Sequence, residues 1–545
     1  MRTHDVLNQP PPLEGYDVFG ADEALVEGVA REGAGWASDE LSELGRLAGS
    51  EEAITWGFEA NANRPVLRTH DRFGHRLDRV DYHPSYHRLM EVAVERGLHG
   101  AAWAQGTAGA HVARAAAFGV WSQVDAGHGC PISMTYAVYP ALRAAPRQLE
   151  AWGPRLSSRQ YDPSFRPAPA KAGCLAGMGM TEKQGGSDVR ANTTTAVADG
   201  EGWRLTGHKW FCSAPNSDLW LMLAQAPAGL SCFLVPRFGP DGGPNSLAFQ
   251  RLKDKLGNHS NASAELELEG AWAELVGEEG RGVATIVTMV NHTRLDCVTG
   301  TAALMRQAVA QATHHAAYRE AFGRVLADQP LMRAVLADLA VESEAATLTM
   351  LRLAGAYDRG EAGFARLATA VAKYWVCKRA PVLAAEALEC LGGNGYVEES
   401  VMSRLFRESP LNGLWEGAGN VICLDVLRAI TRSPLSLDAF VAELDAGLGA
   451  DRRYDTAVEA LKVDLAAATR SAAADPGMLE AGARRLVERM ALALQGSLLV
   501  RWGHPAVADA FSASRLGGDQ GLAPGTLPSG VDCRAVIERA RPKVA

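Results

Sequence analysis

Cys-x-x-Cys motifs, long apolar runs and an excess of positive charge are all missing from this 545-residue sequence. Its nine cysteines are an odd number and lie mostly among apolar neighbours, which is typical of buried thiols in a reducing cytoplasm. No apolar run approaches the roughly 18 residues that a membrane span requires, so we expect a cytoplasmic protein without a membrane partner. A net charge of −9 excludes a protein that is basic over its whole surface.

Motifs of several enzyme classes are also missing. The sequence has no Gly-x-Ser-x-Gly, no P-loop, no His-Glu-x-x-His, and no Gly-x-Gly-x-x-Gly between a strand and a helix. His83 and His87 are four residues apart and could share a metal ion on one helix face. Pro84 instead favours an ordinary helix start, so no metal site is predicted.

The residue pattern along the chain predicts four domains. Their boundaries are 1–170, 171–280, 281–435 and 436–545. The first domain has a proline-rich arm and helical stretches, and ends in a linker with three prolines. The second alternates apolar and polar residues with the period of β-strands, as in residues 264–269, where one face is expected to be apolar and the other to face water. The third has the long helices of an antiparallel bundle, and the fourth is alanine-rich and helical.

Local patterns predict several individual elements. Residues 193–205 predict a β-hairpin around a turn with two glycines. Residues 283–319 and 331–357 predict long helices without an interior proline. Asp475 followed by Pro476 predicts the start of another helix, with Asp as N-cap and Pro in the first helical position.

Three segments combine small residues with groups that could contact a ligand. They are residues 178–188, residues 207–213, and residues 391–396 with 414–420. In the first, a Gly-Gly pair lets a ligand approach the backbone near the hydroxyls of Thr181 and Ser187, although an ordinary turn also explains it. The second has an aromatic residue and a hydroxyl at the end of a strand, where core packing is the ordinary alternative.

Glu416, in the third segment, is a candidate general base. It lies between Trp415 and a turn of small residues that opens a helix. Desolvation by apolar neighbours raises the pKa of a carboxylate and makes it a usable base near neutral pH. The alternative is an acid that complements the macrodipole at a helix N-terminus.

Taken together, these segments resemble the acyl-CoA dehydrogenase family and, more closely, its AidB-like branch. The family motifs match the loop Thr181–Asp188, the strand Lys209–Ser213, the segment Arg319–Gly323, the turn Gly392–Tyr396, and the closing Glu416-Gly417 with Val421. The AidB-like branch adds the N-terminal arm Asn8–Glu14 and the extra C-terminal helices. The resemblance covers nearly the whole chain.

The resemblance implies an α+β fold that is mostly α. It consists of an N-terminal helical domain, a middle β-barrel domain and a C-terminal four-helix bundle, plus extra C-terminal helices. FAD is the implied cofactor, and a homo-oligomer, expected to be a homotetramer, is the implied assembly. The matching positions imply cofactor contacts by Met180, Thr181, Ser187, Phe211, Ser213, Arg319 and Asn420. Phe211 would cover one flavin face, and Arg319 would reach the diphosphate of an FAD in a neighbouring subunit.

The implied reaction is abstraction of a proton next to a thioester carbonyl, with hydride transfer to flavin. Glu416 matches the position of the base. Some relatives carry their base just before the arginine that matches Arg294. Thr293 holds that position here and cannot act as a base at neutral pH, while Arg294 is expected on the substrate side. Arg428 matches an arginine that intrudes on the acyl pocket in this branch. It would keep Glu416 ionised and reduce the turnover of ordinary acyl-CoAs.

Two other functions stay open. The branch is implied to protect DNA from alkylation and to bind duplex DNA through the C-terminal extension. Residues 436–545 hold 13 Lys and Arg against 14 Asp and Glu, so this segment has no net positive charge. Solvated helix faces explain its basic clusters more simply. These clusters are Arg484, Arg485 and Arg489, and Arg534, Arg539, Arg541 and Lys543. The other function is that of a flavin monooxygenase on the same fold.

Overall fold

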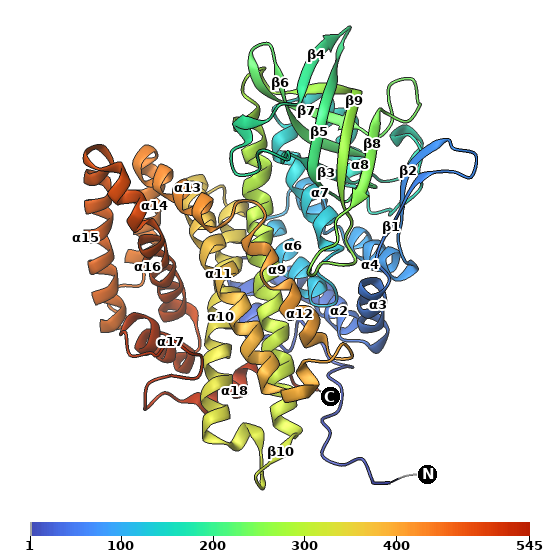
Figure 1. Ribbon diagram of the computed structural model, residues 1–545. Coiled ribbons are helices and arrows are strands. Elements are labelled where there is room, and N and C mark those ends of the chain that lie inside the picture. Colours follow the sequence, from blue (N-terminus) through green and yellow to red (C-terminus); the bar gives the residue numbers. More distant parts are fainter. Residues whose placement is uncertain (1–2, 545) are drawn as a thin grey trace. The chain divides into compact units, whose positions relative to one another are not determined.

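Long helices make up most of the chain, as the sequence predicts, and a closed β-barrel interrupts them (Figure 1). The computed structural model describes residues 3–544, with the backbone alone at residues 471–474. The chain divides into two units. Unit 1 is residues 1–54, 111–123 and 297–545, and unit 2 is residues 55–110 and 124–296. The four sequence domains stay a prediction.

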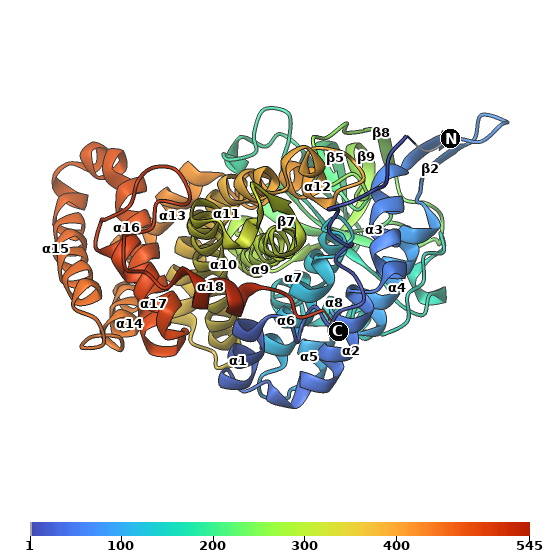
Figure 2. The ribbon, with the colours of Figure 1, turned by 90° about the horizontal axis from the view of Figure 1, so that it is seen from below.

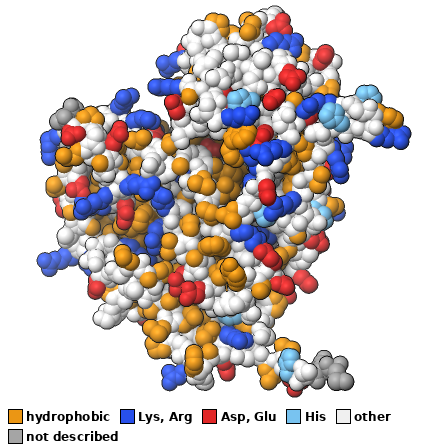
Figure 3. All heavy atoms as spheres, in the orientation of Figure 1, with side chains coloured by type: hydrophobic (Ala, Val, Ile, Leu, Met, Phe, Trp, Pro, Cys, Tyr) orange, Lys and Arg blue, Asp and Glu red, His pale blue; other side chains and the backbone are white. Residues whose placement is uncertain are grey.

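A series of helices precedes the barrel. They are α1 (Glu23–Arg31), α2 (Ser38–Ala48), α3 (Glu51–Ala62), α4 (Pro84–Glu95), α5 (Ala101–Gln105), α6 (Ala110–Ser122), α7 (Gly129–Leu142) and α8 (Pro146–Leu156). The antiparallel strands β1 (Val66–His70) and β2 (Arg76–Asp81) form a hairpin between α3 and α4 that the sequence reasoning did not predict. Basic side chains and histidines gather on this hairpin, and its Phe73 is 69% exposed (Figure 3).

The start of α4 confirms the helix-start interpretation of the His83-Pro84 pair. His83 is the N-cap, and its Nδ1 accepts a hydrogen bond from the backbone N–H of Ser85, while Pro84 holds the first helical position. The ring of His87 hydrogen-bonds to the hydroxyl of Tyr161 at 2.8 Å. Each histidine therefore has a structural partner that does not involve a metal.

Unit 2 contains the predicted β-barrel. Its strands are β3 (Ala176–Gly179), β4 (Thr195–Asp199), β5 (Gly202–Ser213), β6 (Leu219–Ala226), β7 (Gly229–Pro236), β8 (Leu247–Leu252) and β9 (Ser263–Val276). The strand order β3-β6-β4-β5-β9-β7 closes on itself through pairing of β6 with β7, and β8 pairs with β9. Trp220, Phe233 and Phe249 fill the interior and are at most 1% exposed.

Two strand predictions can be compared with the barrel. The predicted hairpin is confirmed: β4 and β5 pair from Thr195–Thr206 to Asp199–Gly202, and Gly200 in their turn has a φ of 60°, which glycine adopts at little cost. The predicted water-facing side of β9 is wrong at Glu265. That carboxylate is buried because two basic side chains of the neighbouring segment pair with it.

Unit 1 holds most of the long helices. They are α9 (Gly282–Tyr318, which begins in unit 2), α10 (Pro330–Asp358), α11 (Ala362–Cys390), α12 (Val401–Glu408) and α13 (Gly419–Arg432), with the short strands β10 (Glu320–Ala321) and β11 (Arg324–Val325) after α9. The predicted helices 283–319 and 331–357 match α9 and α10 to within one residue at each end. α10 and α11 run side by side (Figures 1 and 2), and α11 also packs against α12 and α13.

The extra C-terminal helices are present. They are α14 (Pro434–Asp445), α15 (Arg452–Ala474), α16 (Pro476–Trp502), α17 (Pro505–Phe511) and α18 (Cys533–Ala540). Asp475 caps α16 as predicted, because its carboxylate accepts a hydrogen bond from the N–H of Met478 at 2.9 Å. α16 packs against α10, α11 and α13. Across residues 3–544, no helix has the length and apolar content needed to cross a membrane.

Arg539 joins the last helix, α18, to two other helices of unit 1. Its guanidinium, 6% exposed, contacts Glu344 of α10 at 2.9 Å and Glu23 and Glu27 of α1 at 3.1 and 2.6 Å. Glu344 is itself 9% exposed, so its charge depends on this contact. One arginine thus joins α18 to two helices that lie far from it in the sequence.

Replacing Arg539 tests this attachment. Because Arg539→Ala leaves the buried carboxylate of Glu344 without its cation, we expect the free energy of unfolding to fall by about 3 kcal/mol. Denaturant unfolding measures the loss. The matched control is Arg534→Ala, since Arg534 is exposed on the same helix. Equal stability of the two variants would contradict the role of Arg539.

Candidate functional site

The first predicted ligand segment is a tight loop after β3 that we call the Thr181 loop (residues 180–188). It is closed by two backbone hydrogen bonds between Glu182 and Gly185, of 2.8 and 3.2 Å. A side chain at Gly185 would come within 2.7 Å of the carbonyl oxygen of Asp188, so the close approach of the backbone requires glycine there. Thr181 is half-buried and Ser187 is exposed.

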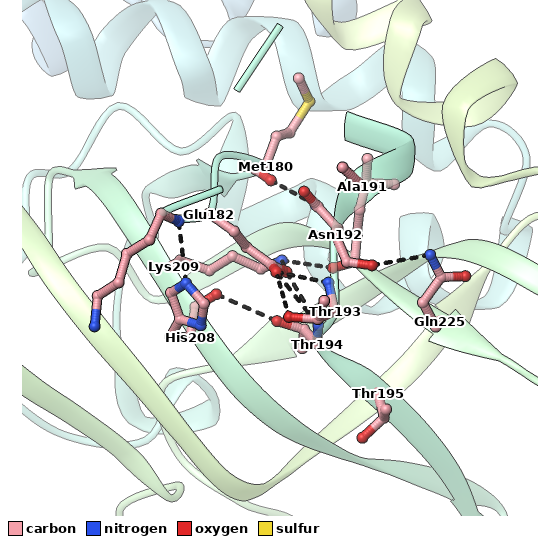
Figure 4. A network of polar contacts seen from close by, with 12 residues as sticks. Met180, Glu182, Ala191, Asn192, Thr193, Thr194, Thr195, His208, Lys209 and Gln225 are labelled. Carbon is pink, nitrogen blue, oxygen red and sulfur yellow. Dashed lines mark hydrogen bonds and ion pairs between the residues drawn. The ribbon is translucent and has the colours of Figure 1, made fainter. Parts of the chain in front are cut away.

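A buried ion pair lies beneath the Thr181 loop (Figure 4). The Nζ of Lys209 contacts Oε1 of Glu182 at 2.8 Å and donates to the carbonyl of Leu223 at 2.7 Å, and both charged side chains are 0% exposed. Glu182 also accepts hydrogen bonds from the backbone N–H groups of Thr193 and Thr194. The ion pair therefore ties the loop to β5, β6 and the segment before β4.

The same network fixes the backbone of the loop at two further points. Asn192 donates its side-chain amide to the carbonyl of Met180 at 2.8 Å (Figure 4). The backbone N–H of Trp210 donates to the carbonyl of Thr181 at 2.8 Å. Met180 and Thr181, two of the predicted cofactor-binding residues, are thus held on both sides. Their position is set by buried polar contacts rather than by the loop sequence alone.

The electrostatics of this network favour the ion pair. Burial raises the pKa of the Glu182 carboxyl, but the charge of Lys209 and the hydrogen bonds from Lys209, Thr194 and Thr193 outweigh burial and lower that pKa to about 2. At neutral pH Glu182 is therefore ionised and forms an ion pair with Lys209.

Phe211 presents an aromatic ring at the end of β5. The pairing of β5 with β9 is irregular between Lys209 and Cys212, and such bulges redirect side chains. Phe211 is 51% exposed, and the Nζ of Lys253 lies 4.6 Å from its ring centroid and 3.2 Å from that of Trp210. An exposed aromatic ring beside a cation can stack against a planar ligand that carries partial negative charge.

Ser213 ends β5 next to Phe211. Its hydroxyl lies 3.1 Å from that of Ser263, the residue opposite it on β9. Unit 2 therefore brings five of the predicted cofactor-binding residues onto one loop and one strand end that hydrogen-bond to each other. They are Met180, Thr181, Ser187, Phe211 and Ser213. Arg294, predicted on the substrate side, is buried on α9 in the same unit.

Glu416 lies in unit 1, in a turn between α12 and α13 that we call the Glu416 turn (residues 414–418). Its φ of 57° is left-handed, and the φ of Gly417 is 104°. A non-glycine residue in this region is strained by about 1–3 kcal/mol, and such residues cluster at functional sites. Glu416 is half-buried, and its role as a base stays a prediction.

Two groups hold the Glu416 turn. The Nζ of Lys373, on α11, donates to the carbonyls of Trp415 and Gly417 at 2.9 and 2.5 Å. The indole N–H of Trp415 donates to Oδ1 of Asn412 at 2.8 Å, and the amide of Asn412 donates to the hydroxyl of Thr301 on α9 at 3.0 Å. The turn is therefore attached to both α9 and α11.

Arg319 lies at the junction of α9 and the β10–β11 hairpin. Its Nη1 donates to the carbonyl of Asn8 in the N-terminal arm at 2.5 Å, and the side chain of Asn8 bonds both backbone groups of Glu320. Phe322, at the hairpin tip, is 99% exposed. The predicted N-terminal arm and the predicted Arg319 segment are thus in direct contact.

The other two predicted residues of unit 1 lie on α13. Asn420 is exposed at the start of the helix, and its Oδ1 accepts a hydrogen bond from Nε of Arg484 on α16 at 2.8 Å. Arg428 is exposed later on the same helix. Its predicted role toward Glu416 stays a prediction.

Three family models match the chain in the order that the structure shows. "Adaptive response protein AidB N-terminal domain" matches residues 8–163, "Acyl-CoA dehydrogenase, middle domain" residues 177–271, and "Acyl-CoA dehydrogenase, C-terminal domain" residues 280–431. Relatives match over most of their length. The Escherichia coli protein AidB is 45% identical over 94% of each chain, and acyl-CoA dehydrogenase family member 11 of Caenorhabditis elegans is 31% identical over 85% of this chain and 79% of its own.

A solved structure agrees with these matches. The crystal structure of Caenorhabditis elegans ACDH-11 in complex with C11-CoA superposes with a TM-score of 0.81 at 27% identity, over 99% of this chain and 93% of that chain. The chain therefore belongs to the acyl-CoA dehydrogenase family, whose members are FAD flavoproteins. Within that family it belongs to the AidB-like branch, as its N-terminal domain and its similarity to AidB show.

Sequence reasoning missed the side chains that hold the site. Glu182 and Lys209 lie inside recognised motifs, but nothing in the sequence says that they form a buried pair. Lys373 was missed altogether, although a lone lysine within the apolar run around it on α11 is a signal of a buried ammonium group. Asn8 was seen only as part of the N-terminal arm.

Breaking the buried ion pair tests the structural basis of the Thr181 loop. Lys209→Met leaves the Glu182 carboxylate buried without its cation, so we expect the free energy of unfolding at pH 7 to fall by about 3–5 kcal/mol. Because the folded-state pKa of Glu182 is about 2 against an ordinary 4.5, the pair stabilises the wild type above pH 4.5, and this stabilisation disappears as the pH falls toward 2.

Denaturant unfolding between pH 7 and pH 2 checks both statements. The acid-dependent loss should be smaller in Lys209→Met, and Lys183→Met is the control because Lys183 is exposed in the same loop. A Lys209→Met protein with wild-type stability at pH 7 would refute the importance of the pair.

Proposed function

We propose that this protein is an FAD-dependent oxidoreductase that removes the α-proton of an acyl thioester with Glu416. The observation that carries the proposal is the conformation of Glu416, which is half-buried and held at a φ of 57° by contacts to its neighbours in the turn. Strain of this kind persists only where the surroundings impose it, and it is frequent at catalytic positions. Membership in the acyl-CoA dehydrogenase family supports the same reaction class.

The α-proton of a thioester is a weak acid, which sets three requirements on the chain. First, the base must be desolvated so that its pKa approaches the operating pH. Second, it must be held at hydrogen-bond distance from the proton, and third, the thioester carbonyl must be polarised. The partial burial of Glu416 supports the requirement for a desolvated base. The attachment of the Glu416 turn to α9 and α11 supports the requirement for a base in a fixed position. In this proposal Glu416 Oε takes the proton from the α-carbon.

The residues present fit a flavin cofactor. In unit 2 the exposed ring of Phe211 and the hydroxyl of Ser213 belong to the end of β5, and the Thr181 loop offers Met180, Thr181 and Ser187. In unit 1 the proposed contacts to the phosphate side are Arg319 and Asn420. A guanidinium suits a diphosphate because its fork of donors matches two phosphate oxygens. Bound FAD would supply the two-electron oxidant for the β-carbon of the substrate.

The proposed substrate class is an acyl-CoA or a related small thioester. The relative solved with C11-CoA supports this class, and we keep Arg294 as the residue proposed on the substrate side. Arg428 is proposed to limit turnover of ordinary acyl-CoAs. A cation in the acyl pocket would compete with the apolar acyl chain for that pocket, and it would stabilise the ionised form of Glu416.

Self-association is part of the proposal. Arg319 is proposed to bind the FAD of a neighbouring subunit, and the hairpin that follows it exposes an apolar tip, with Phe322 99% exposed. Tyr396 and Leu414, in the same unit, are 79% and 64% exposed. Exposed apolar groups of this size are typical of surfaces that another chain covers. A homotetramer is the assembly that we propose.

The described contacts favour this oxidoreductase over a DNA-associated role. In the C-terminal extension Arg489 pairs with Asp464, Arg539 pairs with three carboxylates, and Lys543 pairs with Glu23. Arginines whose charge is already compensated release few counterions on phosphate binding, so they contribute little to affinity for DNA. These pairs reduce the positive charge of both predicted basic clusters.

An anaerobic titration with acyl-CoAs of different chain length tests the proposed function. We expect loss of the flavin colour in the wild type. In Glu416→Gln, which keeps the shape but cannot take the proton, the rate should fall by about 10²–10⁴-fold. Glu480→Gln is the control because Glu480 is an exposed carboxylate on α16. Equal rates in wild type and Glu416→Gln would overturn the role of Glu416. Turnover that needs oxygen and a reductant would instead mark a monooxygenase.

A further inference from the structure

Lys373 is a buried charged residue that contacts the Glu416 turn. It lies on α11 and is 1% exposed. Its ammonium group donates hydrogen bonds to the carbonyl oxygens of Trp415 at 2.9 Å and of Gly417 at 2.5 Å. A buried ammonium group is costly unless its donors are satisfied, so these two bonds fix the backbone that supplies the acceptors.

The two carbonyls stand on either side of Glu416. One belongs to the peptide that precedes Glu416 and the other to the peptide that follows Gly417. Holding both peptides restricts the backbone rotations at the two residues between them, which have left-handed φ values of 57° and 104°. Backbone angles outside the left-handed region would relieve the strain at Glu416, but they would change the relative directions of the two carbonyls that Lys373 binds.

The other buried lysines provide a comparison. Lys171 and Lys209 each contact a buried carboxylate, Asp218 and Glu182, at 2.8 Å. Those pairs compensate charge in the core of unit 2. The hydrogen bonds of Lys373 instead go to two backbone carbonyls of the Glu416 turn, so they restrict the backbone of that turn.

The side chain beside Glu416 is fastened as well. The indole N–H of Trp415 donates to Asn412, and Asn412 donates to the hydroxyl of Thr301. Lys373 of α11 therefore binds the carbonyl of Trp415, and Asn412, which bonds to α9, binds its indole. With the residue before Glu416 fixed at two points, the direction in which Glu416 leaves the backbone is set by the same contacts.

We propose that Lys373 is a positioning residue for the reaction of Glu416: its ammonium group sets the conformation of the Glu416 turn and thereby the direction of the base. The inference rests on the proposed function, and Lys373 itself touches neither substrate nor cofactor in it. An ammonium group suits the task because its three donors can serve two carbonyls at once. A misplaced base costs rate, whereas substrate binding through other residues is largely unaffected.

Three variants test the proposal in the FAD-loaded protein. Lys373→Met keeps the length and removes the donors, and Lys373→Arg keeps charge and donors. Lys373→Gln serves if the Met variant does not fold. Arg539→Ala is the control for a general loss of stability, because the ion pairs described for Arg539 are with α1 and α10 and not with the Glu416 turn.

The first measurement is the rate constant of flavin reduction by an acyl-CoA, together with the Kd of that acyl-CoA and the FAD content. In Lys373→Met we expect the rate constant to fall by about 10²-fold with FAD content and Kd little changed, and Lys373→Arg to recover part of the rate. A Lys373→Met protein that reacts at the wild-type rate, or that loses rate only as it loses FAD, would overturn the proposal.

The second measurement does not depend on activity. Hydrogen–deuterium exchange of the peptide that spans residues 411–421 should be about tenfold faster in Lys373→Met than in the wild type, with little change in Arg539→Ala. Unchanged exchange would overturn the proposal. If the wild type is not reduced by any acyl-CoA, the proposed function fails, whereas the exchange data still decide whether Lys373 holds the turn.

Discussion

A buried ammonium group must satisfy its donors, and this constraint shapes a candidate segment in each of the two units. In unit 2 Lys209 meets the requirement through Glu182, which fixes the Thr181 loop to the barrel. In unit 1 Lys373 meets it through the carbonyls of Trp415 and Gly417, which fixes the Glu416 turn to the bundle. In each unit a buried lysine donates hydrogen bonds to acceptors of a loop and so fixes that loop in place.

Rigid loops on a rigid scaffold are what the proposed chemistry needs. The closed barrel gives unit 2 a stable frame whose strand β5 ends in the exposed ring of Phe211. The helices of unit 1 hold Glu416 in a strained conformation that a free peptide would avoid. Removal of an α-proton depends on the placement of the base as well as on its strength, since a carboxylate in water is a weak base.

Much of the fold could be predicted from the sequence, because the long helices carry clear periodicity and the strands clear turn signals. α9 and α10 were predicted to within a residue at each end, and the helix start at Pro84 and the cap at Asp475 followed from local chemistry. The hairpin of β1 and β2 was missed because its many exposed arginines hide the strand alternation. The buried position of Glu265 was missed because its burial depends on partners from another segment. Site residues that belong to motifs could be named from the sequence. Lys373 could not, because the two carbonyls that it binds are 42 and 44 residues away in the chain.

The central claim is that this member of the acyl-CoA dehydrogenase family holds FAD on the residues described above. The most direct test is the visible absorption spectrum of the purified, folded protein before and after incubation with FAD and removal of the excess. The account predicts the spectrum of a protein-bound flavin at one FAD per chain. A folded protein that is colourless and takes up no FAD would contradict it.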